Sequence, residues 1–276
     1  MDTKDLHSIL PSISTSDSPL YTFKRPYTQR FSLPFDVIKY MIKNCKSAKV
    51  WKKLITSCKF FFPKNPVLPI KDLYVYFDSE CRADKEKFNA SKFFPKLWVY
   101  DSFNYRDSNF PNSKLEISKI FKFDLSDLTM VRQDLTFDEY QKLTSSGSLK
   151  FIDLYSCKIK NSDETFVTVD KLLENLKHLK EFKLIGFNPL MFQSDTVKKM
   201  FQHFNGFKNV RFLKFGRIEE SFDFLSFAEF LLKNETLSIE FSFYEPISDA
   251  YKEVIQNVMN EIKKNPSLRI PKIKFL

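Results

Sequence analysis

The residue types that most often bind metal are few in this sequence, and their spacing does not suit a metal site. The four cysteines are Cys45, Cys58, Cys81 and Cys157. They include no Cys-x-x-Cys pair, and none of the three histidines stands at ligand spacing from them. Structural zinc sites use such closely spaced pairs to complete four ligands. We therefore expect no bound metal and no cofactor.

Catalytic motifs are also missing from the sequence. It contains no GxSxG nucleophile elbow, no GxxxxGK[ST] phosphate loop, no GxGxxG dinucleotide motif and no HExxH metal motif. The carboxylate pair Glu219–Glu220 lies in a charged loop, and His178 lies just before an expected strand, where surface and packing roles are usual. The sequence indicates a protein that is not an enzyme.

A group of lysines near the N-terminus is the one pattern that suggests ligand chemistry directly. Trp51 and Phe60 are interleaved with basic residues at Lys46, Lys49, Lys52, Lys53 and Lys59. Such a surface could follow phosphates and stack a base, so nucleic-acid binding is the alternative function. Two features disfavour it: the apolar residues have the spacing of a core, and lysine greatly outnumbers arginine, the better base reader.

The positive charge is concentrated at one end of the chain. The formal net charge is +10 over 276 residues. Residues 1–66 hold 12 basic and 4 acidic residues, a balance of +8, so the remaining residues hold 32 and 30, a balance of +2. This asymmetry predicts two parts with different partners.

The overall composition is that of a globular protein. Hydrophobic residues make up 43% and charged residues 28%, with 32 Phe but only 4 Gly. No segment reaches the ~20 apolar residues of a membrane span, and residues 1–30 have no apolar signal region. Unpaired cysteines fit a reducing compartment. We expect an intracellular protein, cytoplasmic or nuclear, with no membrane partner.

The N-terminal part is expected to be a disordered arm followed by short helices. Residues 1–30 mix Ser, Thr, Pro and Asp with isolated apolar residues. The segment 32–44 has helical spacing, with Val37 and Met41 four residues apart. Pro34 suits the first turn of this helix, and Ser32 is its expected start.

A second helix is expected directly after the first. Ser47 can cap it. Its apolar face consists of Trp51, Leu54, Ile55 and Cys58, and its basic face of Lys49, Lys52 and Lys53. The sequence PKNP at 63–66 is expected to end this helix. We place a helical module at 31–67.

From residue 68 to 276 a repeated pattern appears. LxxLxL-like copies begin at Leu149, Leu179 and Val210, at steps of 30 and 31 residues, and looser copies begin at 70, 94, 120, 236 and 270. Helical segments separate the later copies. Steps of this size, with strands and helices alternating, predict an irregular leucine-rich-repeat-like solenoid of the α/β class. An ordinary α/β domain with a mixed sheet is the alternative.

The N-terminal module resembles a divergent F-box, particularly the F-box proteins expanded in nematodes, which place it before a Phe- and Lys-rich repeat region. Leu33–Pro34 matches the family's opening Leu-Pro, and Leu54 and residues 57–61 match its later helix. The first apolar helix is matched by Val37, Ile38 and Ile42. Phe61 stands where Trp is commoner in the family, and the middle segment around residues 44–49 lacks the family's Leu-rich stretch.

The resemblance implies a substrate adaptor of a Skp–cullin–F-box ubiquitin ligase, with residues 68–276 holding a target protein. The residues expected to bind the acidic Skp-type adaptor are Leu33, Pro34, Val37, Ile38, Ile42, Trp51, Leu54 and Ile55. A few apolar anchors dominate such helix docking, and nearby lysines speed association with an acidic partner. The alternative is that 31–66 are only a helical cap for the repeats.

The target-binding surface is expected on the outward positions of the repeated strands. Residues between the inward side chains of each strand point to the open face in strand–helix solenoids. These candidate positions are Phe151, Asp153, Glu181, Lys183, Arg211 and Lys214. Their mixed charge could recognise a charged peptide, or it could serve only to keep the protein soluble.

Overall fold

The computed structural model divides the chain into two compact units, residues 1–69 and 70–276. It describes residues 33–76, 80–89, 96–106, 117, 120–193, 195–207, 209–232, 235 and 237–276. The arm predicted at 1–30 and the helix start predicted at Ser32 lie outside the described residues. The domain boundary expected at 67/68 lies within strand β1 (Val67–Val75).

The described part of the first unit, residues 33–69, contains three short helices, α1 (Phe35–Asn44), α2 (Ala48–Ser57) and α3 (Phe61–Lys64). Ser47 caps α2 as predicted, because its hydroxyl oxygen accepts a hydrogen bond from the Val50 amide. The prediction that PKNP ends this helix is wrong. The α2 helix ends at Ser57, and Pro63 lies inside the single turn of α3, where a missing amide hydrogen leaves no helical hydrogen bond unmade.

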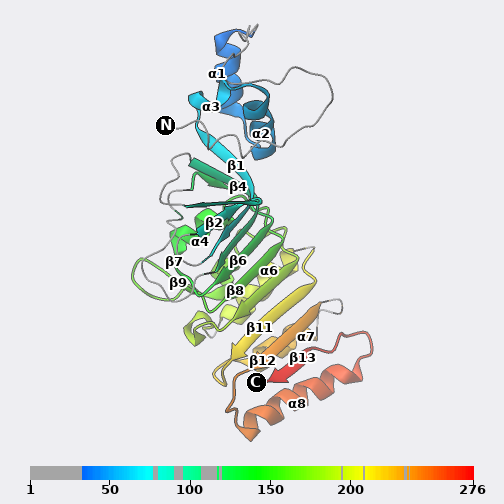
Figure 1. Cartoon of the computed structure of the whole chain (residues 1–276). Coiled ribbons are helices and arrows are strands. Elements are labelled where there is room, and N and C mark those ends of the chain that lie inside the picture. The colour runs from blue at the N-terminus through cyan, green and yellow to red at the C-terminus, as the bar shows by residue number, and fades with distance from the viewer. Residues whose placement is uncertain are drawn as a thin grey trace, which may run out of the picture. The chain divides into compact units, whose positions relative to one another are not determined.

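A large sheet organises the second unit (Figure 1). Eleven strands of the described residues belong to it, in the spatial order β13-β12-β11-β10-β8-β6-β4-β1-β2-β3, with β5 beside β4. Besides β1, the strands are β2 (Glu80–Ala83), β3 (Glu86–Asn89), β4 (Lys96–Arg106), β5 (Lys122–Phe123), β6 (Asp127–Val131), β8 (Phe151–Tyr155), β10 (Glu181–Ile185), β11 (Phe212–Ile218), β12 (Ser238–Phe243) and β13 (Lys272–Phe275). Strands β7 (Asp134–Thr136) and β9 (Lys158–Lys160) pair separately.

The part of this sheet from β4 to β13 is parallel and in register, and it follows the order of the chain. One buried row of aligned side chains consists of Phe103, Leu128, Ile152, Phe182, Leu213 and Ile239, and the next of Tyr105, Met130, Leu154, Leu184, Phe215 and Phe241. Alternation in a strand therefore places the intervening residues on the other face. The predicted α/β class is confirmed.

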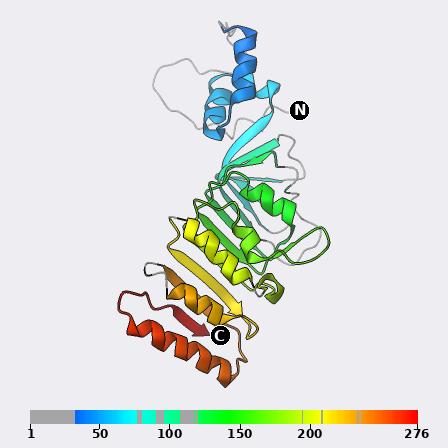
Figure 2. The ribbon, with the colours of Figure 1, turned by 180° about the vertical axis from the view of Figure 1, so that it is seen from behind.

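Helices connect the strands and cover the buried rows. They are α4 (Phe137–Thr144), α5 (Val169–Leu173), α6 (Thr196–Gly206), α7 (Phe224–Leu231) and α8 (Asp249–Lys264), with a 3₁₀ turn at Pro189–Met191. Helices α6, α7 and α8 lie on one face of the sheet (Figure 2). Of the helices expected between the later repeat copies, α5, α7 and α8 lie within the segments 169–176, 223–234 and 248–265, whereas α6 runs two residues beyond the expected segment 194–204. Within the part of the chain that the structure describes, no helix lies on the opposite face of the central strands (Figures 1 and 2).

One strand of the parallel run was not predicted. The repeat pattern fits a copy at 120–125, but only Lys122 and Phe123 form a short strand there. The strand that aligns with β8 is β6, with Leu128 beside Ile152. The true steps between aligned residues from Phe103 onward are therefore 25, 24, 30, 31 and 26 residues. The spacing is less regular than the sequence pattern indicates.

A column of left-handed residues follows four neighbouring strands. Arg132, Ser156, Gly186 and Arg217 have φ of 55°, 51°, 66° and 57°, and each comes directly after the aligned residue of its strand. The same backbone turn thus recurs at the carboxyl edge of β6, β8, β10 and β11. It is a structural repeat that the side-chain pattern does not reveal.

Replacing Gly186 with alanine is expected to destabilise this edge. A Cβ there would lie 2.7 Å from Ser156 Oγ and 3.5 Å from Arg217 Cδ. Gly147 is a matched control, because its φ is +65° and its nearest neighbour would be 3.6 Å away. We expect urea denaturation to show a loss of about 2 kcal/mol for Gly186→Ala and about 1 kcal/mol for Gly147→Ala. Equal losses would contradict the close approach at Gly186.

Candidate protein-interaction surfaces

The first unit exposes an apolar surface on helix α1. Leu33, Pro34 and Val37, all predicted to bind the adaptor, are exposed. Phe35 and Tyr40 also belong to this surface, with 61% and 69% of their area accessible, although the sequence analysis did not include them. We call these five residues the α1 surface. An apolar surface of this kind marks an interaction site more often than a solvated helix face.

Two residues predicted to bind the adaptor are core residues instead. Ile38 is 3% and Trp51 1% exposed, so neither can contact another protein directly. The indole Nε1–H of Trp51 donates to the Val67 carbonyl oxygen at 2.8 Å, and its ring meets Phe61 edge-on. They face inward because three short helices need large apolar side chains at their centre. Ile42, Leu54 and Ile55 are partly buried and line the sides of this core.

Lysines surround the α1 surface. Residues 33–69 contain eight lysines and one acidic residue, Asp36. Lys39, Lys43, Lys46 and Lys49 are exposed. A single carboxylate cannot neutralise this charge within the segment, so the surface is suited to a partner that is acidic around an apolar groove.

The second surface is the helix-free face of the parallel sheet. Phe151, Glu181 and Phe212 align in one row of this face across β8, β10 and β11. The next row consists of Asn104, Thr129, Asp153, Lys183, Lys214, Glu240 and Lys272, from β4 to β13. Five of the six residues predicted for target binding therefore occupy outward positions, side by side.

The sixth, Arg211, was assigned the wrong position. It precedes β11, and the residue aligned with Phe151 and Glu181 is Phe212. The register of this copy is as predicted, because Leu213 and Phe215 align with Phe182 and Leu184, so the outward residue directly before Leu213 is Phe212 and not Arg211. Arg211 still reaches the open face, because its Nη2 lies 3.8 Å from Glu181 Oε1.

A shallow, open hollow lies on this face over β8, β10 and β11. We call it the sheet hollow. It is lined by Asp153, Glu181, Lys183, Ile185, Arg211, Phe212, Lys214 and Arg269. It thus brings together five of the six predicted residues with three that were missed: Ile185, Phe212 and Arg269. No local sequence signal marks Arg269, which comes from the loop before the last strand.

The charges beside the hollow are partly paired. Lys214 Nζ lies 3.0 Å and Lys274 Nζ 2.9 Å from the same oxygen of Glu240. The hydrogen bond from Lys274 and that from Lys214 hold the pKa of Glu240 below its usual value, although burial opposes them. Burial raises the pKa of Asp153, against the opposing effect of Lys183. The Asp153 charge is therefore disfavoured in this position.

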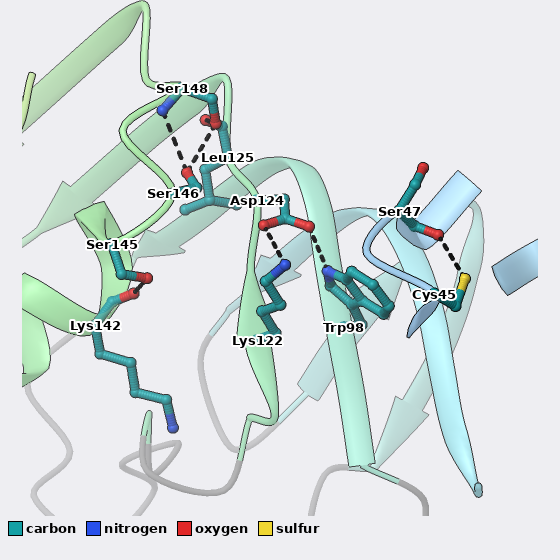
Figure 3. A network of polar contacts seen from close by, with 10 residues as sticks. All are labelled: Cys45, Ser47, Trp98, Lys122, Asp124, Leu125, Lys142, Ser145, Ser146 and Ser148. Carbon is teal, nitrogen blue, oxygen red and sulfur yellow. Dashed lines mark hydrogen bonds and ion pairs between the residues drawn. The ribbon is translucent and has the colours of Figure 1, made fainter. Parts of the chain in front are cut away.

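A polar cluster in β4 and β5 has a structural role (Figure 3). The indole Nε1–H of Trp98 donates to Asp124 Oδ2 at 2.7 Å, and Lys122 Nζ lies 3.1 Å from Asp124 Oδ1. Lys122 also lies over the Trp98 ring, 4.7 Å from its centre. The three side chains satisfy one another and fix β5 beside β4, so they leave no group directed toward a ligand.

Three further properties of the described part of the chain concern a metal site, a reactive thiol and a membrane span. No group of three His, Cys, Asp or Glu residues there could hold a metal ion. The four cysteines are free thiols, and burial raises the pKa of Cys81 and of Cys157 to about 11. None of the described helices is long and apolar enough to cross a bilayer. No protein-family model and no curated protein matches this chain.

Proposed function

We propose that this chain is the substrate-recognition subunit of a Skp–cullin–F-box ubiquitin ligase. The observation that carries the proposal is the α1 surface, a group of exposed apolar side chains in and directly before α1, within a segment of eight lysines and one acid. Such a helix docks by placing its apolar side chains in a groove between partner helices. The small, acidic Skp-type adaptor is the partner, and it connects the chain to the cullin.

The second unit is proposed to be a leucine-rich-repeat-like solenoid that holds the target protein. Two observations support this. The strands from β4 to β13 follow chain order without a reversal, whereas a doubly wound sheet reverses its order at a switch point. The left-handed turn also recurs after four successive strands. A repeat architecture of this kind offers one continuous open face for a partner.

Nucleic-acid binding through the N-terminal lysines has less support. That alternative needs an aromatic ring exposed between basic residues, so that a base can stack on it. Trp51 is buried, and Phe60 is only partly exposed. Among the described residues of this unit, the exposed rings are Phe35 and Tyr40, and both lie on the α1 surface.

We expect the double variant Leu33→Ala with Val37→Ala to lose binding to a purified Skp-type adaptor. Both side chains are exposed in the free chain, so truncation leaves the core of the unit intact. Each central apolar anchor of an interface contributes about 1–2 kcal/mol, so loss of both should lower the affinity roughly thirtyfold to several hundredfold. Isothermal titration with the full chain measures this loss.

A matched control removes exposed leucines from the other unit. Leu190 and Leu225 are both well exposed there. The double variant Leu190→Ala with Leu225→Ala therefore tests whether exposed apolar side chains bind the adaptor nonspecifically. This control should bind the adaptor with unchanged affinity. If the α1 variant also bound normally while remaining folded, the proposed adaptor interface would be rejected.

A further inference from the structure

The sheet hollow is lined by both basic and apolar side chains. Four cationic side chains border it, namely Lys183, Arg211, Lys214 and Arg269, against two carboxylates, those of Asp153 and Glu181. Phe212 and Ile185 supply its apolar part. Lys183 Nζ lies over the Phe212 ring, 5.9 Å from the ring centre. The hollow therefore offers apolar contact and excess positive charge together.

The centre of the hollow places two like charges next to each other. Lys183 and Lys214 are directly aligned on the adjacent strands β10 and β11. Asp153 flanks the pair on one side and Glu240 on the other, so the row has the order carboxylate, lysine, lysine, carboxylate. Like charges directly opposite each other destabilise a sheet. An incoming carboxylate between the two lysines would remove this repulsion.

The flanking carboxylates compensate this pair only in part. Glu240 is shared between Lys214 and Lys274, and the ionised form of Asp153 is disfavoured by its burial. Arg211 lies 3.8 Å from Glu181, at the outer limit of an ion pair. Positive charge thus remains available to an anionic ligand on this part of the sheet.

We propose that the sheet hollow binds an acidic segment of a target protein, in which carboxylates flank a large apolar side chain. The apolar side chain packs on Phe212 and Ile185, and the carboxylates pair with Lys183, Lys214 and Arg269. This inference rests on the proposed function, because the acidic segment is taken to belong to the target protein that the ligase ubiquitinates.

A peptide fits this hollow better than a nucleic acid does. The Glu181 carboxylate stands among the cations, and it would repel a continuous phosphate backbone. A peptide can instead place each separate carboxylate against a cation and avoid Glu181. Toward the other end of the same sheet, burial and neighbouring carboxylates raise the pKa of Asp72 and of Asp127. Carboxylates gathered there disfavour an acidic ligand, so the acidic segment is placed on the β10–β13 side.

The test uses fluorescence polarisation with two labelled peptides and the full chain. One peptide is Gly-Ser-Glu-Glu-Phe-Glu-Glu-Ser-Gly, and the other has Gln in place of every Glu. We expect the acidic peptide to bind at least tenfold more tightly at low salt. Lys183→Gln with Arg269→Gln should weaken its binding about tenfold or more, because two partners of its carboxylates are removed.

A matched variant separates the hollow from net charge. Lys198 in α6 and Lys263 in α8 are exposed on the helices that cover the other face of the sheet. Lys198→Gln with Lys263→Gln removes the same charge and should leave peptide binding within twofold. Circular dichroism melting verifies that both variants fold.

Equal binding of the two peptides, or equal weakening of binding by the two double variants, would overturn the inference. A competition experiment gives a third such result: an oligodeoxythymidine that displaces the labelled acidic peptide at a lower concentration than the unlabelled acidic peptide does. Adaptor titration on the same variants distinguishes this failure from that of the proposed function. If the acidic peptide does not bind while the adaptor still binds through the α1 surface, only the assignment of the hollow is wrong.

Discussion

Replacing Trp51 with alanine is expected to unfold the N-terminal helices and thereby abolish adaptor binding, although the indole does not belong to the α1 surface. Trp51 is 1% exposed, and truncating a fully buried Trp costs about 3–5 kcal/mol. The change also leaves the Val67 carbonyl without its donor, which costs about 1–3 kcal/mol more if that oxygen stays buried. A core formed by three short helices cannot absorb such a loss.

Hydrogen exchange of the α1 and α2 amides measures this effect directly. In Trp51→Ala we expect both helices to lose protection, while β8 and β10 of the second unit keep theirs. Trp51→Phe retains an aromatic ring and loses only the N–H donor and part of the volume, so its protection should be intermediate. Persistent protection of α1 in Trp51→Ala would show that the indole is not the centre of this core.

A surface variant completes the comparison. Phe35→Ala truncates a ring that is 61% exposed, so it should leave amide protection in α1 unchanged and still weaken adaptor binding. Trp51→Ala and Phe35→Ala would then both reduce binding, one through stability and the other through contact. The exchange data distinguish these two causes.

The sequence predicts the N-terminal helices but not the residues that they bury. Helical spacing and the cap at Ser47 are local properties, and α1 and α2 form where the pattern places them. Apolar residues occur on more than one side of α1, however. Which side is covered depends on tertiary packing, so Ile38, predicted to bind the adaptor, is buried, and the exposed Phe35 was missed.

The strands show a similar division between local and nonlocal information. β8 and β10 have clear alternation and lie where predicted. β6 was missed because the chain leaves the sheet between Phe123 and Asp127 and then re-enters it, so the pattern at 120–125 fits the template better than the true strand does. The register of β11 follows from the sequence, because Leu213 and Phe215 align with Phe182 and Leu184, and only the outward residue was wrong, Arg211 in place of Phe212.

The sheet hollow could be predicted only in part. Outward positions of β8 and β10 follow from alternation once the strands are known, which identifies Asp153 and Lys183. Arg269 lies outside any strand and reaches the hollow only through the path of the chain from α8 to β13. Its participation depends on tertiary structure, and nothing in the residues around it indicates that.

Replacing Phe227 with alanine is expected to destabilise the second unit more than any surface change. Its ring is fully buried on α7 and lies 5.1–5.9 Å, centre to centre, from those of Phe201, Phe215, Phe222, Phe230 and Phe241. The cluster connects α6 and α7 to β11 and β12. A chain with 32 Phe fills this space with rings that cannot easily collapse into a void.

We expect Phe227→Ala to lower the free energy of unfolding by about 3–5 kcal/mol, through lost burial and the cavity that remains. Phe227→Leu, which retains most of the volume, should cost about half as much. Leu225→Ala on the same helix removes an exposed side chain and should change stability by less than about 0.5 kcal/mol. Urea denaturation monitored by circular dichroism measures all three, and a loss below 1 kcal/mol for Phe227→Ala would mean that the aromatic cluster does not hold the α7 helix on the sheet.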